Sequence, residues 1–492
     1  MAFGWVDFGV VVTYLIAITL FGAHFGKRQR TIHDYFLGGR RLPWWAIAFS
    51  IVSAETSILT IISTPGIAYV SNLNFLQLVF GYLVARVVVA LVLIPRYFAG
   101  ELYTAYQLIE QRFGRPMRIL TAGLFLATRA LAEGVRVFAI SIVIGVILKT
   151  GVLTSVIIIT ALTLFYTYRG GLTAVIWTDV IQLVIYISGT VLALVIALHT
   201  IPGGWQQVAH LAATNGDKFA VFRFGFNWHQ PYLFWSGLIG GAFLSTASHG
   251  TDQLIVQRLL AARSMRQSQA AIIASGVIIL FQFALFLIAG VVLFAFYRHF
   301  PPAHSFARSD QVFPSFVVSY LPTGLAGLVV AAILAAAMAN LSAAFNSLAS
   351  SSVVDFYKPL SCSQADERHN LRVSRLITLG WGAVLILIAL IAQRIERSVL
   401  ELALTIASVP YGSMLGIFLL GVLTKRTTGV AAALGAGAGL VALFAVMGLT
   451  SVAWTWYVAI GACVTFVVGW GYGWGLGTAP PAQPGRQTSN PA

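Results

Sequence analysis

Charged residues and cysteines are both scarce in this sequence. Only 9% of its 492 residues are Asp, Glu, Lys or Arg, and it holds two cysteines, Cys362 and Cys463. Soluble domains carry about 25% charged residues, so the composition excludes a large soluble enzyme. Two distant cysteines exclude a disulfide framework and a cysteine metal site. With 58% hydrophobic residues, the chain is predicted to be an all-α integral membrane protein.

Sequence motifs for ATP-driven transport, channels and metal catalysis are missing as well. The sequence has no Gly-x-x-x-x-Gly-Lys motif and no soluble domain to hold one, which excludes an ATP-driven pump. It shows no repeated filter segments of a channel. His24, His33 and His249 are scattered, without the His/Glu spacing of a metal enzyme. We therefore expect no enzymatic activity and no cofactor.

Long apolar segments dominate the chain instead. A helix needs about 20 apolar residues to cross a bilayer, and we identify thirteen segments of comparable length. The first carries Asp7 and no small-residue cleavage site, so it is predicted to be a membrane helix rather than a signal peptide. The thirteen segments span residues 5–25, 44–69, 73–98, 117–148, 151–168, 173–199, 232–258, 267–297, 322–354, 372–392, 399–423, 428–447 and 452–472.

The basic residues are unevenly distributed between the loops. Twenty of the 30 Lys and Arg, Arg258 among them, fall in segments that are cytoplasmic if the N-terminus is outside. Seven fall in outside segments and three within spans. Cytoplasmic loops carry an excess of Lys and Arg, so we predict a multi-pass protein of the cell membrane with its N-terminus outside and its C-terminus in the cytoplasm. The net charge of +15 is thus a topology signal, and no nucleic-acid partner is expected.

Several spans contain ionisable side chains, each of which costs roughly 2.5–3.5 kcal/mol on insertion scales. Arg129, Glu133 and Arg136 follow one another at i, i+4 and i+7, which places them on one helical face. We expect these three residues to form an internal ion network. Arg86 and Glu55 are further candidates for it.

Two spans that lie five apart in the order are interrupted by polar residues. The second contains "SIVSAETSILTIISTPG" and the seventh contains "LSTASHGTDQ". Polar side chains can satisfy an unwound backbone where it lines a cavity. Interrupted helices at corresponding places in two halves indicate an inverted-repeat secondary transporter with its solute between the breaks. His249, in the second interruption, is predicted to contact solute or a gate rather than to act as a catalytic base.

Six motifs in consecutive order resemble the sodium:solute symporter family over about residues 30–430. The motifs are "DYFLGGRRLPWW", "YTAYQLIEQRFG", "GGLTAVIWTDVIQ", "DQLIVQRLLAARS", "FNSLASSSVVDFYKP" and "LGIFLLGVLTKRTTG". Members of this family couple inward sodium flow to the uptake of sugars, amino acids, carboxylates or vitamins. The resemblance therefore implies a leucine-transporter-like core and sodium as coupling ion.

The implied core consists of two inverted repeats of five helices each. The expected units are an extra N-terminal helix with a basic loop (1–43), the first repeat (44–200), an extracellular loop (201–231), the second repeat (232–424), two C-terminal helices (425–475) and a disordered cytoplasmic tail (476–492).

The resemblance also implies a sodium site between the first broken helix and the eighth core helix. Backbone carbonyls of Phe49, Val52 and Ala336 would be ligands. The family's pair of hydroxyl ligands falls on Ala339 and Asn340. Sodium, a hard cation, prefers several oxygen ligands, so the missing hydroxyl at Ala339 weakens the implied site.

Asp179 matches the acid of the family's "TDxxQ" motif, near the sodium site. Ser342 matches one hydroxyl of a second sodium site, whose other hydroxyl is replaced by Ala343. Two mechanisms stay open. Either sodium binds the carbonyls, Asn340 and Asp179, or Asp179 carries a proton and transport is proton-coupled or uncoupled. We favour sodium. A sensor that no longer transports is a further alternative.

The solute is expected to be a small organic acid, an amino acid or a sugar-like molecule. Sugar-transporting relatives place hydrogen-bonding side chains at positions that here include Ile51, Val79, Ile279 and Leu404, so a galactose-type pocket is not expected. One chain is expected to suffice for transport. The predicted solute contacts are Thr56, Tyr82, Ser245, Ser248, His249, Thr251 and Tyr411.

Overall fold

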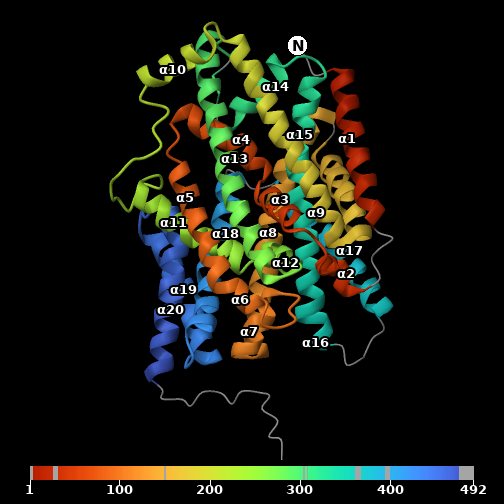
Figure 1. Ribbon diagram of the computed structural model, residues 1–492, viewed down its shortest axis with the longest axis vertical. Helices are drawn as coiled ribbons and strands as arrows, with labels where there is room; N and C mark the ends of the chain where they lie inside the picture. The colour runs from red at the N-terminus through yellow and green to blue at the C-terminus, as the bar shows by residue number, and fades with distance from the viewer. Residues whose placement is uncertain are drawn as a thin grey trace, which may run out of the picture.

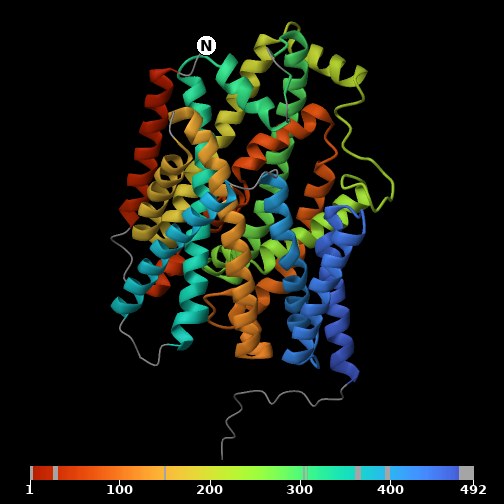
Figure 2. The same ribbon diagram turned by 180° about the vertical axis from the view of Figure 1, so that it is seen from behind.

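The computed structural model describes residues 4–25, 31–148, 151–302, 305–306, 309–360, 367–393 and 399–475. This part of the chain is helical apart from loops and one isolated β-bridge between Leu42 and Ala262. The predicted disordered tail, 476–492, and Cys362 lie outside the described residues. Helices α10 and α14 lie at the end of the bundle that carries the N-terminus, and α7 and α16 lie at the opposite end (Figure 1). Seen from behind, α8 and α18 run side by side (Figure 2).

The helix bounds follow the predicted spans closely. The helices are α1 Trp5–His24, α2 Ile32–Leu37, α3 Trp44–Glu55, α4 Ile58–Val70, α5 Leu76–Val88, α6 Ile94–Tyr97, α7 Ala105–Phe113, α8 Arg115–Leu148, α9 Val152–Thr200, α10 Gly204–Thr214, α11 Phe234–Gly250, α12 Gln253–Leu260, α13 Met265–His299, α14 Val312–Tyr320, α15 Leu325–Ser351, α16 Lys358–Leu360, α17 Glu367–Ala392, α18 Val399–Leu423, α19 Gly429–Leu449 and α20 Tyr457–Gly475. A π-helical turn, Val89–Leu93, joins α5 to α6, and a second one, Ser352–Tyr357, joins α15 to α16.

Among the described residues, eight helices are long and apolar enough to cross a membrane, and nine if the bent pair α3–α4 counts as one span. Helix α9 contains two of the predicted spans, which meet at Gly171 (φ 54°, ψ −153°). A Cβ atom at Gly171 would lie 2.5 Å from the Tyr35 carbonyl oxygen, so this turn requires glycine. The total of thirteen spans stays a prediction.

Both predicted helix interruptions are present. Helices α3 and α4 meet at a 65° bend, and α11 and α12 are separated at residues 251–252. The two breaks use the same chemistry. Thr56 and Thr251 each donate from their hydroxyl to the carbonyl four residues earlier, at 2.7 and 2.8 Å. Ser57 and Asp252 then cap the next helix by accepting a backbone N–H.

Helix α15 forms the centre of the bundle. In its most apolar window 94% of the residues are buried, whereas the corresponding share is 33% in α1 and α19. Asp7 of α1 lies at the N-terminus of α15, where its Oδ1 accepts the backbone N–H groups of Gly324 and Gly327, each at 2.7 Å. A carboxylate at a helix N-terminus is stabilised by free amides and the helix dipole. These contacts explain an acidic residue in the first span.

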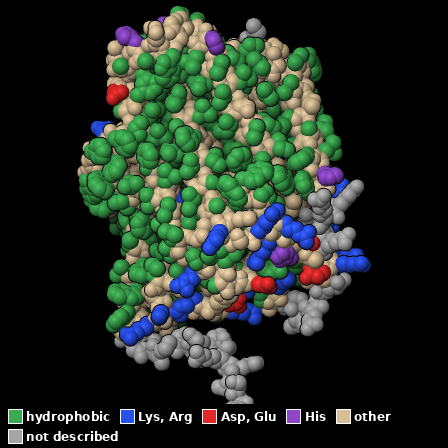
Figure 3. Space-filling view, viewed as in Figure 1, with side chains coloured by type: hydrophobic (Ala, Val, Ile, Leu, Met, Phe, Trp, Pro, Cys, Tyr) green, Lys and Arg blue, Asp and Glu red, His purple; other side chains and the backbone are tan. Residues whose placement is uncertain are grey.

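The surface of the bundle is divided between apolar and charged regions. Hydrophobic side chains cover most of the face in Figure 3, and Lys and Arg gather toward the end that carries α7 and α16. Large exposed apolar residues, such as Leu387 on α17 and Val441 on α19, are 58% and 69% exposed. Such a surface fits helices whose outer faces contact lipid.

A buried lysine holds the C-terminal end of α4. Lys218, in the segment between α10 and α11, is only 4% exposed. Its ammonium donates to the carbonyls of Tyr69 and Ser71, both at 2.8 Å, and lies 4.1 Å from the centre of the Phe294 ring. These carbonyls belong to the last turn and the C-cap of α4, where a cation is favoured by the helix dipole. Lys218 therefore fixes one end of the helix whose other end forms the break.

We predict that Lys218→Met lowers the melting temperature of the detergent-solubilised protein by the equivalent of about 1–3 kcal/mol, because it leaves buried carbonyls without a donor. Burial lowers the pKa of Lys218 to about 8. Above about pH 8, Lys218 is deprotonated in the folded protein but still protonated in the unfolded chain. The folding stability of the wild type therefore rises with pH in this range, whereas Lys218→Met lacks this gain. The exposed Lys425 gives the control, Lys425→Met. Equal melting temperatures for both variants at every pH would contradict this role.

Candidate functional site

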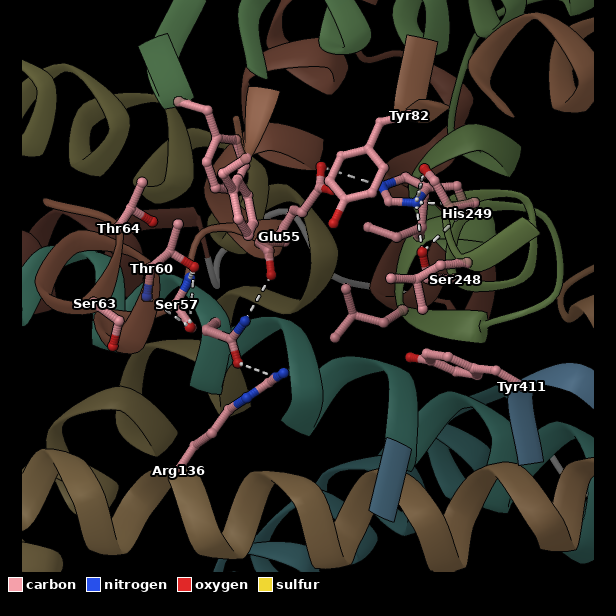
Figure 4. Close-up of a pocket in the computed structure, with 18 of the residues that line it drawn as sticks. Glu55, Ser57, Thr60, Ser63, Thr64, Tyr82, Arg136, Ser248, His249 and Tyr411 are labelled. Carbon is pink, nitrogen blue, oxygen red and sulfur yellow. Dashed lines mark hydrogen bonds and ion pairs between the residues drawn. The ribbon is translucent and has the colours of Figure 1, made fainter. Parts of the chain in front are cut away.

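A cavity of about 280 Å³ lies between the two helix breaks. A polar stripe on α4 forms one wall, and residues of α11 form the opposite wall (Figure 4). The stripe consists of Ser57, Thr60, Ser63 and Thr64, whose spacing places them on one face of the helix. The Ser57 hydroxyl accepts the Thr60 N–H at 3.3 Å. The positive end of the α4 dipole lies at this N-terminus, so this wall favours an anionic group.

Helix α8 contributes the predicted ion network below the cavity. Glu133 Oε1 accepts from Arg129 Nη1 at 2.9 Å and from Arg136 Nη1 at 2.5 Å. The network extends to another helix, because Arg129 also pairs with Asp252, the N-cap of α12. Asp252 in turn accepts the Tyr411 hydroxyl at 2.7 Å. The pairing along α8 is therefore confirmed, and it also holds the second helix break against α8 and α18.

Asn340 connects α15 to the first break and to this network. Its Nδ2 donates to the Ala54 carbonyl at 2.6 Å, and its Oδ1 accepts from Arg136 Nη1 at 3.1 Å. A carbonyl only accepts and a guanidinium only donates, so the orientation of the amide is fixed by both partners. The side-chain oxygen predicted to bind sodium faces a cation here. This contact gives no support to Asn340 as a sodium ligand.

Arg86 and Glu55 form a second network at the opposite side of the cavity. Arg86 is fully buried, and its guanidinium donates to Glu55 Oε2 at 2.6 Å and to the Ser245 hydroxyl at 2.7 Å. His249 Nε2 lies 3.3 Å from the same Glu55 oxygen. This cluster joins α3, α5 and α11. Glu55 and Arg86 were predicted as further candidates for the network on α8, but they pair with each other instead.

Aromatic side chains complete the cavity wall. Phe75 and Phe283 stack with their ring centres 5.3 Å apart, and Tyr82 meets the Phe283 ring edge-on at 6.4 Å. Tyr232 and Trp454 also line the cavity. Ligand sites are typically apolar with a few placed polar groups, and this cavity has that composition.

The predicted ion residue Asp179 lies in a separate, completely buried pair. Asp179 Oδ2 accepts from Arg258 Nη2 at 3.0 Å and from the Ser50 hydroxyl at 2.5 Å. Arg258 also donates to the Ser50 hydroxyl and to the Leu254 carbonyl. Arg258 was counted among the cytoplasmic basic residues, but it is buried in α12 rather than exposed in a loop. The side of the membrane on which it lies stays a prediction.

One carboxylate oxygen of Asp179 lacks a protein partner. Asp179 Oδ1 is buried without a hydrogen bond among the described residues, and the polar side chains of Ser53 and Gln182 lie in the same part of the interior. Tyr166 lies beside Asp179, Gln182 and Ser342. Buried polar groups are normally satisfied, and oxygen ligands suit a hard cation. Asp179 and Ser342 therefore belong to a region that could hold sodium.

The predicted carbonyl ligands are placed less favourably. The Val52 carbonyl accepts both the N–H and the hydroxyl of Thr56, at 3.0 and 2.7 Å. The Phe49 and Ala336 carbonyls lie within helices α3 and α15. The role of these three carbonyls in sodium binding stays a prediction.

Five of the seven predicted solute contacts line the cavity: Tyr82, Ser245, Ser248, His249 and Tyr411. The other two, Thr56 and Thr251, are fully buried outside it and serve the helix breaks. Sequence reasoning missed the stripe on α4, although the i, i+3, i+7 spacing of Ser57, Thr60 and Thr64 was a signal for it. It also missed the aromatic wall, which carries no recognisable spacing.

Comparison with known proteins agrees with this architecture. The model of the sodium:solute symporter family matches residues 35–442. The sodium/sialic acid symporter SiaT of Proteus mirabilis is 27% identical, over 99% of this chain and 97% of that protein. The human sodium/iodide cotransporter is 30% identical, over 91% of this chain and 70% of that protein.

Solved structures show the same fold. A Na⁺-coupled sialic acid symporter in a substrate-bound outward-open state superposes with a TM-score of 0.89 at 27% identity, covering 97% of this chain and 99% of that chain. MHP1, a nucleobase-cation-symport-1 family transporter, superposes with a TM-score of 0.57 at 11% identity, covering 90% and 94% of the two chains. The predicted leucine-transporter-like fold is confirmed.

We predict that Arg258→Met destabilises the protein by about 3–5 kcal/mol, because it leaves Asp179 buried without its cation. The double variant Asp179→Asn/Arg258→Met should be more stable than Arg258→Met alone, since no unpaired charge remains. Melting temperatures of the two proteins in detergent measure this difference. A double variant that melts lower than the single one would show that the pair does not act as a unit.

Proposed function

The chain belongs to the sodium:solute symporter family, and we propose that its solute is a small organic anion with a carboxylate group. It is a multi-pass membrane transporter that couples an organic solute to sodium, and it is not an enzyme. The cavity between the breaks would bind this solute. One observation carries the proposal: the N-terminus of α4 and the Arg136 guanidinium face the same cavity.

The charge of Arg136 is incompletely satisfied by the protein. Its Nη1 is shared between Glu133 and Asn340, and its buried Nε has no hydrogen-bond partner among the described residues. Glu133 is itself shared with Arg129. An arginine with unused donors at a cavity wall is suited to a carboxylate, which can accept two parallel hydrogen bonds. The serine and threonine hydroxyls on α4 would add further donors.

The relatives are consistent with an anionic solute. The names of the similar proteins refer to sialic acid, iodide and monocarboxylates, which are all anions at neutral pH. The volume of about 280 Å³ favours a small molecule, since drug-sized ligands occupy about 300–1,000 Å³. The aromatic wall would pack against the apolar part of the solute.

For the coupling ion we propose the region around Asp179 and Ser342. The buried Asp179 Oδ1 atom without a hydrogen bond among the described residues supports this assignment, whereas the contacts of Asn340 argue for a role in holding Arg136 instead. We also propose that the N-terminus lies outside and the C-terminus in the cytoplasm, and the gathering of Lys and Arg at the end with α7 and α16 supports it (Figure 3). The cavity is built from one chain, so a monomer would suffice for transport.

Proteoliposome uptake tests both parts of this proposal. Uptake of labelled lactate or N-acetylneuraminate at fixed pH should be lost when sodium is replaced by choline, because the ion gradient then no longer drives transport. In competition, monocarboxylates should inhibit and neutral sugars should not. Uptake that is unchanged in choline would contradict sodium coupling. Inhibition by neutral sugars alone would contradict the proposal that the solute carries a carboxylate group.

We predict that Arg136→Gln raises the KM for a carboxylate solute about 10- to 100-fold, because the loss of a charge-assisted hydrogen bond costs about 1.5–3 kcal/mol. Arg136→Lys should recover part of the affinity, since it keeps the charge but not the planar fork. The exposed Arg263 gives the control, Arg263→Gln. An Arg136→Gln protein with the wild-type KM would exclude Arg136 from the solute site.

A further inference from the structure

His249 lies where the two helix breaks and the cavity meet. It belongs to the last turn of α11, is 2% exposed and lines the cavity wall opposite the α4 stripe (Figure 4). Its Nε2 atom lies 3.3 Å from the carboxylate of Glu55, the last residue of α3. The ring therefore contacts the end of one broken helix from the end of the other. A change in its charge would act on both breaks at once.

The surroundings of the His249 ring are rich in hydrogen-bond acceptors. Nδ1 lies 3.1 Å from the Ser245 carbonyl, which can only accept, and 2.8 Å from the Ser248 hydroxyl, which can accept or donate. Nε2 faces the Glu55 carboxylate and has no well-aligned hydrogen bond. Neutral imidazole carries a proton on one nitrogen only, whereas imidazolium donates from both. With a second proton, both ring nitrogens would donate, and each already has an acceptor nearby.

The charged groups around the ring come from two other helices. Glu55 on α3, whose carboxylate oxygen lies 3.3 Å from Nε2, has the charge opposite to imidazolium, and Arg86 on α5 has the same charge as imidazolium. Arg86 and Glu55 pair with each other at 2.6 Å, so their effects on the ring partly cancel. Tyr82 of α5 lines the same wall without a charge at neutral pH. A further negative charge in the cavity would therefore shift the balance toward the protonated ring.

We propose that His249 is a proton-binding site that fills when an anionic solute enters the cavity. This inference rests on the carboxylate solute proposed above, whose negative charge in the same cavity would favour the imidazolium form of His249. Linkage makes the effect reciprocal: the solute promotes protonation, and protonation strengthens solute binding. Histidine changes its charge between about pH 5 and 8. Solute affinity is then set by external pH as well as by sodium.

Calorimetry on the full chain in lipid nanodiscs tests this site, with N-acetylneuraminate and lactate as probes at fixed high sodium. Titrations in two buffers of different ionisation enthalpy count the protons taken up on binding. The wild type should take up a fraction of one proton near pH 7, and its affinity should rise as pH falls, by at most about tenfold per pH unit for one linked proton. His249→Gln should bind without proton uptake, while the control His210→Gln, at an exposed position, should match the wild type.

A second variant covers the case in which His249→Gln does not fold. Glu55→Gln keeps the histidine but removes its carboxylate partner, so the pH at which affinity rises should move lower by about one unit or more. Proton uptake that is equal in wild type and His249→Gln would overturn the inference, as would carboxylate binding without proton uptake or pH dependence. Absence of binding by both carboxylates in the wild type would instead contradict the proposed solute, and the proton site would fall with it.

Discussion

The need to satisfy backbone groups inside a membrane is the constraint on which the rest of this structure depends. Two spans stop and restart in the protein interior, and each break would leave amides and carbonyls without water. The chain solves this twice with a threonine that donates to the previous turn and a capping side chain that opens the next helix. The N-terminus of α4, with its positive dipole end and its stripe of hydroxyl groups, forms the anion-favouring wall of the cavity.

Buried ion pairs join the two breaks to the surrounding helices. Arg86 and Glu55 connect α5 to α3, and Arg129 connects α8 to Asp252 at the start of α12. Arg258 connects α12 to α9 through Asp179. Such pairs add little stability in themselves, but breaking one is costly because a buried charge is left alone. They therefore favour a few well-defined arrangements of the broken helices, as a transporter with alternating access needs.

Several of these features could be predicted from the sequence because they depend on spacing along one helix. The pairs on α8 follow from residues at i, i+4 and i+7, and the breaks follow from polar residues concentrated inside apolar spans. The partners across helices could not be predicted, because Asp252 and Arg129 are separated by 123 residues. The burial of Arg258 could not be predicted for a related reason: hydropathy shows where an apolar segment ends but not that a short helix there turns inward.

The contacts of Asn340 do not support the sodium-binding role that the resemblance implied for it. Its position in the sequence matches a sodium ligand of the family, yet its amide is held between the Ala54 carbonyl and Arg136. The same residue can thus support the solute site by positioning an arginine. A neighbouring alanine in place of the family's hydroxyl is compatible with this change of role. The buried oxygens near Asp179 leave an alternative place for the ion.

We propose that a carboxylate binds between the two helix breaks, at the N-terminus of α4 and Arg136. A crystal structure with a bromine-labelled monocarboxylate tests it most directly, because anomalous scattering locates the bromine independently of the protein. We predict a bromine signal against the aromatic wall near Phe283, with the carboxylate directed at Ser57, Thr60 and Arg136. A carboxylate bound outside this cavity, or turned toward Glu55, would contradict the account.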